Sequence, residues 1–337
     1  MSSLSIYVGL DYHDETLRVC VMTEGGEMRF NRDMKNDPLA IAELIKEFGE
    51  PTSVAIEACC GASSFATELR RITGWDVRQA HPGYVAQLKK SKDKTDFGDA
   101  RLLADLLRVG YLPEVWLADV DTRQLRRLIR YRQGLVRDRK DVKLRLRSVL
   151  RDERVKLDNV RPWTNAWMEW VRTVELPEHS RWVVDRLLAQ LDDLVQRVAE
   201  TEDRCREAIA DDDVSQKLLE QPGIGLVTAV TLRAEIGHFE RFSSGKKLAR
   251  FCGVTPRNAS SGKRQADAGL VCESNEALRS VLVQAAKRLP RCDDRWKEFK
   301  DRLRVSKPAN VVTAAIANRW IRWLYHQMVS PVAEIAA

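Results

Sequence analysis

The order of apolar segments in residues 1–110 constrains the fold of this chain more than any other feature of its sequence. Short apolar runs of strand length come first, and segments with helical spacing then alternate with further short runs. The predicted elements are, in chain order, a strand at 4–11, a strand at 17–22, a hairpin turn at 24–27 into a third strand, a helix at 36–48, a strand at 53–56, a helix at 64–72, a strand at 76–80 and helices from about residue 99. Three strands followed by alternating helices and strands predict a mixed α/β sheet.

Beyond Pro113 the pattern changes to long amphipathic segments. Residues 122–156 carry apolar side chains at spacings of three, four and seven, which predict one long helix with many arginines and lysines. Residues 181–209 predict a second such helix, and a connector rich in tryptophan joins the two. We therefore expect an antiparallel coiled-coil hairpin, followed from residue 218 by a mainly helical region. The three predicted segments are residues 1–112, 113–213 and 214–330.

The composition of the chain indicates a basic globular protein. It has 337 residues, of which 44% are hydrophobic and 31% charged, and its formal net charge is +7. A basic balance is typical of proteins that bind nucleic acid, although charge by itself identifies no partner. The 7 cysteines include no C-x-x-C pair, which favours reduced thiols in a cytoplasmic protein. The 5 histidines are scattered, which argues against a zinc site, and no apolar run reaches the ~20 residues of a membrane span.

Four acidic residues stand at positions where they can meet. Asp11 ends the first predicted strand, and Glu57 directly follows the strand at 53–56. Asp96 and Asp99 are three apart at the start of a predicted helix, so both lie on one helical face. Carboxylates brought together repel one another unless a cation neutralises them, and Mg²⁺ or Mn²⁺ binds carboxylate oxygens together with phosphate. The alternative is that the helical pair is only a solvated acidic helix N-terminus.

The motifs around these acids occur in a specific order. They are G-L-D at the end of the first strand, I-E-A-x-x-G at the end of a later strand, and K-T-D-x-x-D-A-x-x-L-A at the start of the helix. Together they resemble the RuvC-like (RNase H-like) domain of the DEDD transposases of bacterial insertion sequences. The resemblance implies that Asp11, Glu57, Asp96 and Asp99 hold the catalytic Mg²⁺. The sequence departs from the family at C-C-G after Glu57, where a shorter step to Gly61 is expected.

A second group of polar residues occurs at 248–264, L-A-R-F-C-G-V-T-P-R-N-A-S-S-G-K-R. These residues indicate a helix, a Gly/Pro break and then a Ser-Ser-Gly loop among cations. A serine in such a loop can serve as a nucleophile if a base or a metal activates it, and neighbouring arginines and lysines suit a phosphate electrophile. Serine–glycine loops are more often plain loops, so the residues alone leave the role of this loop open.

The same family supplies a context for this loop. G-V-T-P-R, S-G and the later L-R-x-x-L-x-x-A-A at 278–286 resemble its C-terminal transposase domain. The resemblance implies that Ser261, or alternatively Ser260, is the nucleophile. It further implies phosphate contacts by three cations, Arg257, Lys263 and Arg264. The sequence departs from the family where Cys272 and Ser274 stand near a position usually held by a basic residue.

Two further features suit phosphate binding. The P-G-I-G stretch at 222–225 resembles the hairpin of a helix-hairpin-helix, in which Gly223 and Gly225 let backbone N–H groups approach a phosphate. A tight turn between packed helices explains this stretch equally well. The basic helix at 122–156 predicts a cationic stripe for nucleic-acid backbone, part of which is a solvated face. The stripe residues that we expect to contact nucleic acid are Arg126, Arg130, Arg137, Lys143 and Arg147.

The resemblance implies a DNA transposase that cuts and rejoins donor and target DNA through a covalent phosphoserine intermediate. It also implies guidance by a structured non-coding bridge RNA, assembly into a dimer or tetramer, and a cytoplasmic protein that associates with the nucleoid while active. Two alternatives remain open from the residues alone. The acids suffice for a metal-dependent nuclease or junction resolvase that uses water and no serine. A basic surface suffices for a nucleic-acid-binding protein that is not an enzyme.

Overall fold

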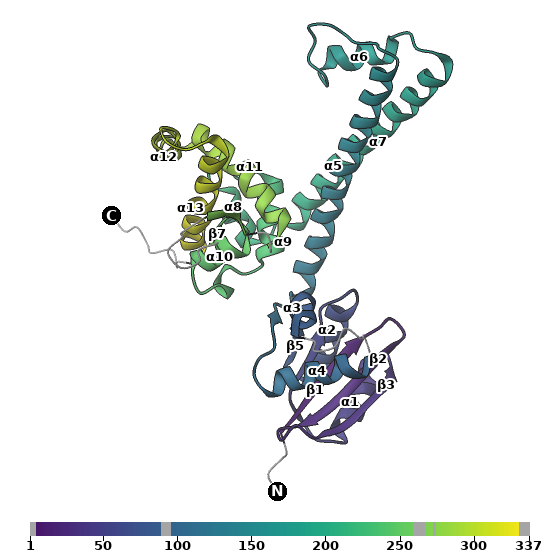
Figure 1. The fold of residues 1–337 in the computed structure, drawn as a ribbon, viewed down its shortest axis with the longest axis vertical. Coiled ribbons are helices and arrows are strands. Elements are labelled where there is room, and N and C mark those ends of the chain that lie inside the picture. The colour runs from purple at the N-terminus through teal and green to yellow at the C-terminus, as the bar shows by residue number, and fades with distance from the viewer. Residues whose placement is uncertain (1–4, 89–95, 259–266, 272–273, 330–337) are drawn as a thin grey trace. The chain divides into compact units, whose positions relative to one another are not determined.

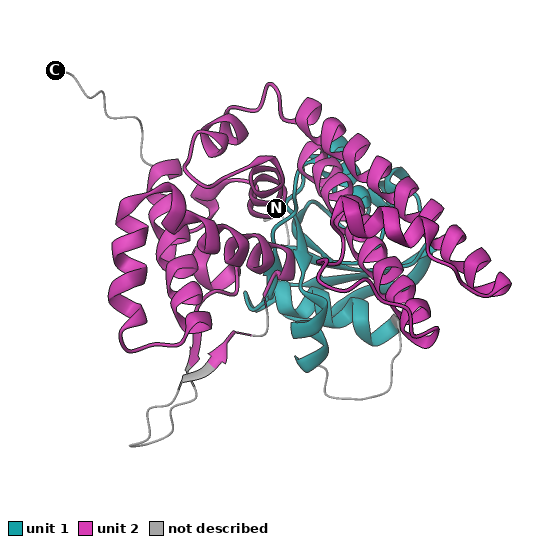
Figure 2. Cartoon of the chain, turned by 90° about the horizontal axis from the view of Figure 1, so that it is seen from above, with its two compact units in different colours: residues 1–119 teal, residues 120–337 magenta. Residues whose placement is uncertain are grey.

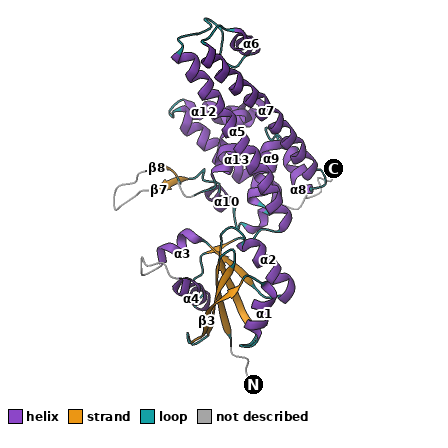
Figure 3. Ribbon diagram, turned by 90° about the vertical axis from the view of Figure 1, so that its right-hand side faces the viewer, coloured by secondary structure: helices purple, strands orange, loops and turns teal. Residues whose placement is uncertain are grey.

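The computed structural model describes residues 5–88, 96–258, 267–271 and 274–329. Contacts within the chain divide it into two compact units, residues 1–119 and 120–337 (Figure 2). The first unit contains a sheet with helices, and the second is mainly helical (Figure 3). The prediction of an α/β N-terminal part followed by a helical remainder is therefore confirmed. The borders predicted at 112/113 and 213/214 stay predictions.

The N-terminal unit is built on a mixed six-stranded sheet. Its strands are β1 (Ile6–Tyr12), β2 (Thr16–Thr23), β3 (Met28–Lys35), β4 (Pro51–Glu57), β5 (Val77–Ala80) and β6 (Glu114–Val115). They are ordered β3-β2-β1-β4-β5-β6 across the sheet. β1, β2 and β3 form an antiparallel meander, whereas β4 pairs in parallel with both β1 and β5. The three consecutive strands that the sequence predicts thus become the meander, and the strands that alternate with helices become the parallel part.

Helices cover both faces of this sheet. They are α1 (Pro38–Lys46), α2 (Ala62–Thr73), α3 (Pro82–Leu88) and α4 (Asp96–Arg108). Because successive side chains of a strand point to opposite faces, β1 contributes to two apolar layers. Val8 and Leu10 pack with buried side chains of α1 and α2, and Gly9 lies against α4 on the other face. The sheet is therefore the middle layer of three.

Two long helices begin the C-terminal unit. They are α5 (Val120–Asp152) and α7 (Glu178–Ala208), with the short α6 (Asn165–Thr173) in the connector between them. α5 and α7 lie side by side (Figure 1), and the seam between them buries Val142, Leu146 and Leu191. The apolar spacing of the sequence thus marks the faces that meet. Knobs-into-holes coiled-coil packing of this pair stays a prediction.

The end of α5 corrects the helix predicted at 122–156. The N–H of Val155 donates to the carbonyl of Leu150 at 3.0 Å, and Arg154 adopts a left-handed φ of 54°. This is the geometry of a Schellman cap, which ends a helix by satisfying its last carbonyls. The last basic residues of the predicted stripe therefore lie in the connector and not on α5.

The remainder of the C-terminal unit packs around one apolar core. Its elements are α8 (Asp213–Leu219), α9 (Leu226–Ile236), the 3₁₀ helix η1 (Phe239–Arg241), α10 (Gly245–Phe251), β7 (Pro256–Asn258), β8 (Asp267–Leu270), α11 (Glu276–Cys292), α12 (Asp294–Arg304) and α13 (Ala309–Val329). The fully buried Trp320 lies in this core. β7 and β8 form a two-stranded antiparallel sheet that the sequence analysis did not predict. Within the described part of the chain, no helix is long and apolar enough to cross a membrane.

Candidate active site

Asp11 and Glu57 lie at the same edge of the sheet. β1 and β4 are parallel neighbours in which Gly9 pairs with Ala55. Asp11 and Glu57, two positions further along, therefore lie side by side at the ends of these strands. Gly9 and Ala55 both face α4. Since side chains alternate between the two faces of a strand, the two carboxylates project from the face that α4 covers.

α4 approaches β1 closely because Gly9 has no side chain. A Cβ atom at this position would lie 2.0 Å from the carbonyl oxygen of Ala100 and 2.6 Å from the backbone nitrogen of Ala104. At the start of β1, Tyr7 packs against the cluster that contains Leu107, near the end of α4. α4 therefore runs opposite to β1 and begins near the carboxyl end of that strand.

The first turn of α4 thus lies at the edge that carries Asp11 and Glu57. This turn begins with Asp96 and includes Asp99, whose exposed fraction is 8%. The fold brings the backbone positions of all four predicted acids to one edge of the sheet. The side chain of Asp96 lies outside the described part of the structure.

The donor chemistry of this edge suits a hard divalent cation, because carboxylate oxygens are the ligands that Mg²⁺ and Mn²⁺ prefer. Among the described side chains, however, no three His, Cys, Asp or Glu groups are gathered as a metal site. Asp96 is not part of that set. Coordination by the complete group of four acids therefore stays a prediction.

Both strand-end carboxylates contribute to the electrostatic surroundings of the Cys59 thiol. Burial raises the pKa of this thiol, and the charges of Glu57 and Asp11 raise it further, whereas a hydrogen bond from the backbone of Ala62 lowers it. The imidazole Nε2 of His13 lies 3.5 Å from Oδ2 of Asp11. A negative potential at this edge favours cations and disfavours a thiolate.

Residues that sequence reasoning missed hold the first turn of α4 in place. Arg18 of β2 pairs in register with Asp11, and its Nε donates to Oδ1 of Asn31 at 2.8 Å. Nδ2 of Asn31 in turn donates to the carbonyl of Phe97 at 3.0 Å, and the guanidinium of Arg18 lies 5.6 Å from the centre of the Phe97 ring. The sequence feature that could have indicated these contacts was Arg18, the single arginine within the otherwise apolar strand predicted at 17–22.

The C-C-G departure from the family has a structural role. Gly61 precedes α2 with a left-handed φ of 87°, and a Cβ atom there would lie 2.3 Å from the hydroxyl oxygen of Tyr12. The loop after Glu57 therefore folds against the end of β1. This contact requires glycine at that step, because any side chain would collide with the Tyr12 ring.

The second group of predicted residues is only partly described. Those that lie outside the described residues are Ser260, Ser261, Lys263, Arg264 and Cys272. Arg257 lies on β7 and is exposed. Before β7, Nδ2 of Asn318 donates to the carbonyl of Val254 at 3.1 Å and to Oγ1 of Thr255 at 3.4 Å. α13 thereby anchors the segment that precedes β7.

Two motifs that are distant in the sequence meet at Gly253. Gly253 has a φ of 69°, and a Cβ atom there would lie 2.1 Å from Oγ of Ser274 and 2.7 Å from Nη2 of Arg279. Arg279 donates hydrogen bonds to Oγ of Ser274 and to the carbonyl of Val271. The glycine of G-V-T-P-R and the arginine of L-R therefore form one packed unit, in which Ser274 is an internal partner.

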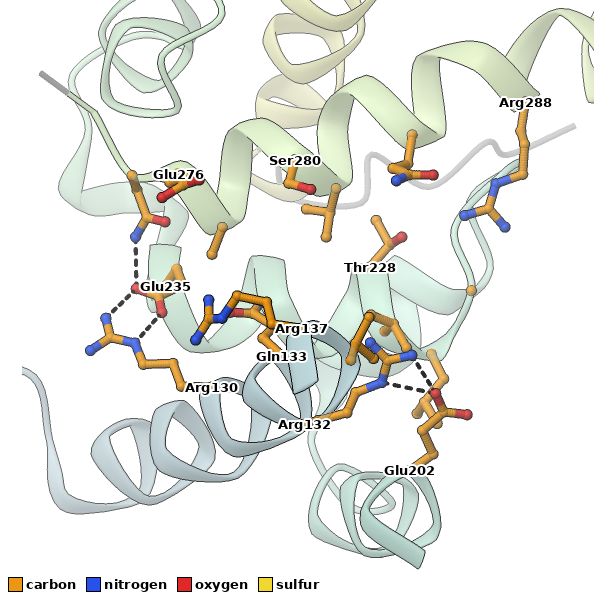
Figure 4. Close-up of a pocket in the computed structure, with 18 residues that line it drawn as sticks. Arg130, Arg132, Gln133, Arg137, Glu202, Thr228, Glu235, Glu276, Ser280 and Arg288 are labelled. Atoms are coloured by element: carbon orange, nitrogen blue, oxygen red, sulfur yellow. Dashed lines mark hydrogen bonds and ion pairs between the residues drawn. The ribbon is translucent and has the colours of Figure 1, made fainter. Parts of the chain in front are cut away.

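Two of the predicted nucleic-acid contacts on α5 are engaged within the fold. Nε and Nη2 of Arg130 donate to the two carboxylate oxygens of Glu235 at 2.8 and 2.9 Å (Figure 4). Arg126 donates through Nε to the carbonyl of Ala234 at 2.7 Å. The Glu235 side chain is only 3% exposed, so these arginines join α5 to α9 and neutralise a buried charge. The hydrogen bonds that Arg130 donates to Glu235 also raise the pKa of this arginine.

The other predicted contacts on α5 differ among themselves. Nζ of Lys143 lies 4.7 Å from the centre of the Trp163 ring, and burial lowers the pKa of this lysine. Arg137 and Arg147 are exposed.

The two glycines of the P-G-I-G stretch at 222–225 also differ. A Cβ atom at Gly223 (φ of 80°) would lie 3.1 Å from Cδ2 of Leu289, whereas Gly225 is exposed at the N-cap of α9. Binding of nucleic acid by any of these residues stays a prediction.

Comparisons with known proteins agree with both groups of motifs. A family model for DEDD transposases of the IS110 type, described as a transposase, matches residues 8–153. A second model, described as "Transposase IS116/IS110/IS902 family", matches residues 215–301. The first match includes the four acids at the edge of the sheet, and the second includes residues 259–266.

Similar proteins extend along most of the chain. The transposase for insertion sequence element IS1328 of Yersinia enterocolitica is 28% identical over 280 residues, 81% of this chain and 82% of that protein. A protein of Pseudomonas aeruginosa named "Probable family 20 transposase" is 29% identical over 326 residues, 94% of this chain and 95% of that protein. The transposase for IS1111A of Coxiella burnetii is 22% identical over 287 residues, 84% of this chain and 78% of that protein.

Proposed function

Because this chain belongs to the IS116/IS110/IS902 family of insertion-sequence transposases, we propose that it cuts and rejoins DNA through a covalent phosphoserine intermediate. The observation that supports this most is the meeting of Asp11, Glu57 and the first turn of α4 at one edge of the sheet. In this proposal the unit is an RNase H-like domain, and a metal-assisted phosphoryl transfer takes place at that edge.

The four acids Asp11, Glu57, Asp96 and Asp99 would hold Mg²⁺ or Mn²⁺. A bound divalent cation offsets the negative charge of the phosphodiester and makes its phosphorus more electrophilic. The residues that position this set belong to the chain itself. Gly9 allows α4 to lie against β1, and the contacts of Arg18 and Asn31 hold the first turn of α4 at the edge of the sheet.

Ser261 is the proposed nucleophile, with Ser260 as the alternative. Its Oγ forms a bond to phosphorus while the bond from phosphorus to one sugar oxygen breaks, and the serine proton leaves as the freed sugar oxygen gains one. In the rejoining step a sugar hydroxyl attacks the phosphoserine and releases the serine. Each step exchanges one phosphoester bond for another, so the reaction needs no external energy source.

Cations beside the serine loop complete this proposal. Three of them, Arg257, Lys263 and Arg264, would offset the negative charge that develops on the phosphate oxygens during transfer. Because the acids and the loop belong to different compact units, they would meet either within one chain or between chains of a dimer or tetramer. In the cell, the protein would act in the cytoplasm on nucleoid DNA, guided by a structured bridge RNA from its own element.

Recombination assays with matched variants test this function. The substrate is plasmid DNA that carries the ends of the element, with the non-coding segment that flanks the gene supplied as RNA. We expect Ser261→Ala and Asp99→Ala each to abolish strand exchange, whereas Ser260→Ala keeps it. Full strand exchange by Ser261→Ala or Asp99→Ala would contradict the scheme.

The same assay separates the proposal from a metal-dependent nuclease or junction resolvase. Such an enzyme uses water in place of serine. If Ser261→Ala and Ser260→Ala both still cut the DNA in a Mg²⁺-dependent manner while Asp99→Ala does not, the nuclease is the correct assignment and the phosphoserine mechanism is wrong.

A further inference from the structure

The C-terminal unit contains a large pocket of about 990 Å³ between α5, α9 and α11, lined by both charged and apolar side chains (Figure 4). Four arginines line it, and they come from two different helices: Arg130, Arg132, Arg137 and Arg288. Its volume is at the upper end of the roughly 300–1,000 Å³ of small-molecule sites, but such sites are mostly apolar. A lining rich in charged groups favours a charged ligand.

The register of the three helices gives the pocket two distinct ends. Arg130 of α5 and Asn275, which caps α11, both donate to Glu235 in the last turn of α9. At the other end, Gly223 of the hairpin lies against Leu289 of α11. α11 therefore runs opposite to α9, and its later residues lie level with the beginning of α9.

Arg288 consequently belongs to the end of the pocket at the start of α9, whereas the side chain of Arg137 extends from α5 toward Glu235 (Figure 4). Arg288 directly precedes Leu289, which contacts the hairpin. Figure 4 shows Thr228 and Arg288 on the side of the pocket away from Glu235.

The four arginines differ in how far their charges are compensated. Arg130 is paired with Glu235, and Nε of Arg132 donates to Oε1 of Glu202 at 2.8 Å, so both of these arginines are neutralised. Arg137 and Arg288 are exposed, and neither forms an ion pair or a hydrogen bond with any residue of the described part. The pocket therefore carries two uncompensated positive charges, one on α5 and one on α11.

The beginning of α9 adds a third favourable feature for an anion. Gly225 is exposed, lines the pocket and provides no side-chain cap for the helix. The first N–H groups of a helix have no partner within it, and the helix dipole adds partial positive charge at that point. Gln133 of α5 and Gln284 of α11 line the space alongside, with neutral groups that can donate to oxygen.

We propose that this pocket binds the phosphodiester backbone of a nucleic-acid strand, whose phosphates contact Arg137 on α5 and Arg288 on α11. A phosphate would face the N–H groups at the start of α9. The site would position the strand without reading its sequence, because its groups suit phosphate and sugar oxygens. The inference rests on the proposed function, in which both DNA and a guide RNA are ligands, and either supplies this chemistry.

Binding measurements on the full-length protein test the site. The probes are a fluorescein-labelled 20-nucleotide RNA strand and a labelled DNA duplex of equal length, followed by fluorescence anisotropy at several salt concentrations. The variants are Arg137→Ala and Arg288→Ala. Their matched controls are Arg145→Ala on α5 and Lys287→Ala on α11, because both controls remove an exposed cation outside the pocket.

We expect each pocket variant to weaken binding by about fivefold or more near 0.1 M salt, and to reduce the slope of log K against log salt by about one. The controls should stay within about twofold, and Arg288→Lys should retain most of the affinity because a phosphate accepts either cation. A loss confined to RNA assigns the site to the guide, and a loss confined to DNA assigns it to donor or target. Unchanged binding of both probes, or equal losses in the controls, overturns the proposal.

Two further measurements keep this test distinct from that of the proposed function. Thermal unfolding of each variant shows whether a loss of binding comes from a loss of folding, and Arg288→Lys provides the charge-preserving comparison. Formation of a serine–DNA adduct by the wild type is scored separately. If the adduct forms while the pocket variants bind normally, only the pocket proposal fails; if no adduct forms while they bind weakly, only the phosphoserine proposal fails.

Discussion

Substitution of Gly9 by alanine tests how the fold positions the acids. The added Cβ would lie 2.0 Å from the carbonyl oxygen of Ala100 and 2.6 Å from the nitrogen of Ala104, whereas real Cβ atoms stay beyond 3.0 Å. Since both neighbours are backbone atoms, no rotamer change relieves the clash. α4 must move away from β1 by about 1 Å, and Asp99 moves with it.

Two consequences of Gly9→Ala can be measured. Overpacking of this kind costs about 1–3 kcal/mol, which lowers Tm by roughly 4–12 °C for a unit of this size. A displacement of about 1 Å at a reacting group can reduce the rate by about a hundredfold. We therefore expect a lower Tm by circular dichroism and strand exchange reduced about tenfold to a hundredfold at a temperature where the variant is folded.

Gly25→Ala is the matched control, because a Cβ there would meet only Oγ1 of Thr23 at 3.9 Å. It should leave strand exchange unchanged. If Gly9→Ala also kept the wild-type Tm and the wild-type rate, then the close approach of α4 to β1 would not position the acids, and the reasoning would be refuted.

Three further predictions concern the rest of the chain. Hydrogen bonds from the first turn of α8 and the charge of an arginine on α9 outweigh burial and hold the pKa of Asp212 below its usual range. The stability that ionised Asp212 contributes is therefore present above about pH 4 and is lost as the pH falls through the folded pKa. Asp212→Asn should lower the free energy of unfolding, measured in urea, by about 1 kcal/mol at pH 7 and by progressively less in acid. Gly134 lies within α5, and a Cβ atom added there would meet no other atom within 4 Å. Gly134→Ala should therefore stabilise the protein by about 0.5–1 kcal/mol in the same assay. A loss of stability would show that the position is not an open helical site. Burial raises the pKa of Cys20 and of Cys205 to about 11. At pH 8 both thiols should therefore react with a disulfide reagent far more slowly than the exposed Cys292, and they should become reactive when urea unfolds the chain. Rapid labelling of either thiol in the native protein would contradict their burial.

The sequence predicted the elements best where periodicity is strong. The meander and the alternating strands of the sheet, and the pairing of α5 with α7, follow from apolar spacings of two and of three to four residues. The short elements α6, β7 and β8 were missed, because a few residues carry too little periodicity to distinguish a helix or a strand from a loop. The end of α5 was predicted too late in the sequence because its Schellman cap has Arg154 at the left-handed position, where glycine is the usual residue and the usual sequence signal of a helix end.

The candidate site shows a similar division. The positions of Asp11 and Glu57 at strand ends, and of Asp99 in the first turn of α4, were predicted from their place in the sequence. The tether from Arg18 to the first turn of α4 was not, because it joins segments that are distant along the chain. For the same reason, the sequence analysis did not anticipate that Arg130 pairs with buried Glu235. Contacts of this kind are determined by tertiary packing and leave no local signal.

The most direct test of the central claim is to identify the atom of the protein that becomes joined to DNA. Wild-type protein would be incubated with Mg²⁺, guide RNA and a DNA substrate containing the element's end, then denatured, digested and analysed by mass spectrometry. The account predicts a nucleotide attached to the peptide containing Ser261, and loss of that adduct in Ser261→Ala and in Asp99→Ala. Cleaved DNA with no adduct on any serine, in amounts that Ser261→Ala does not reduce, would contradict it.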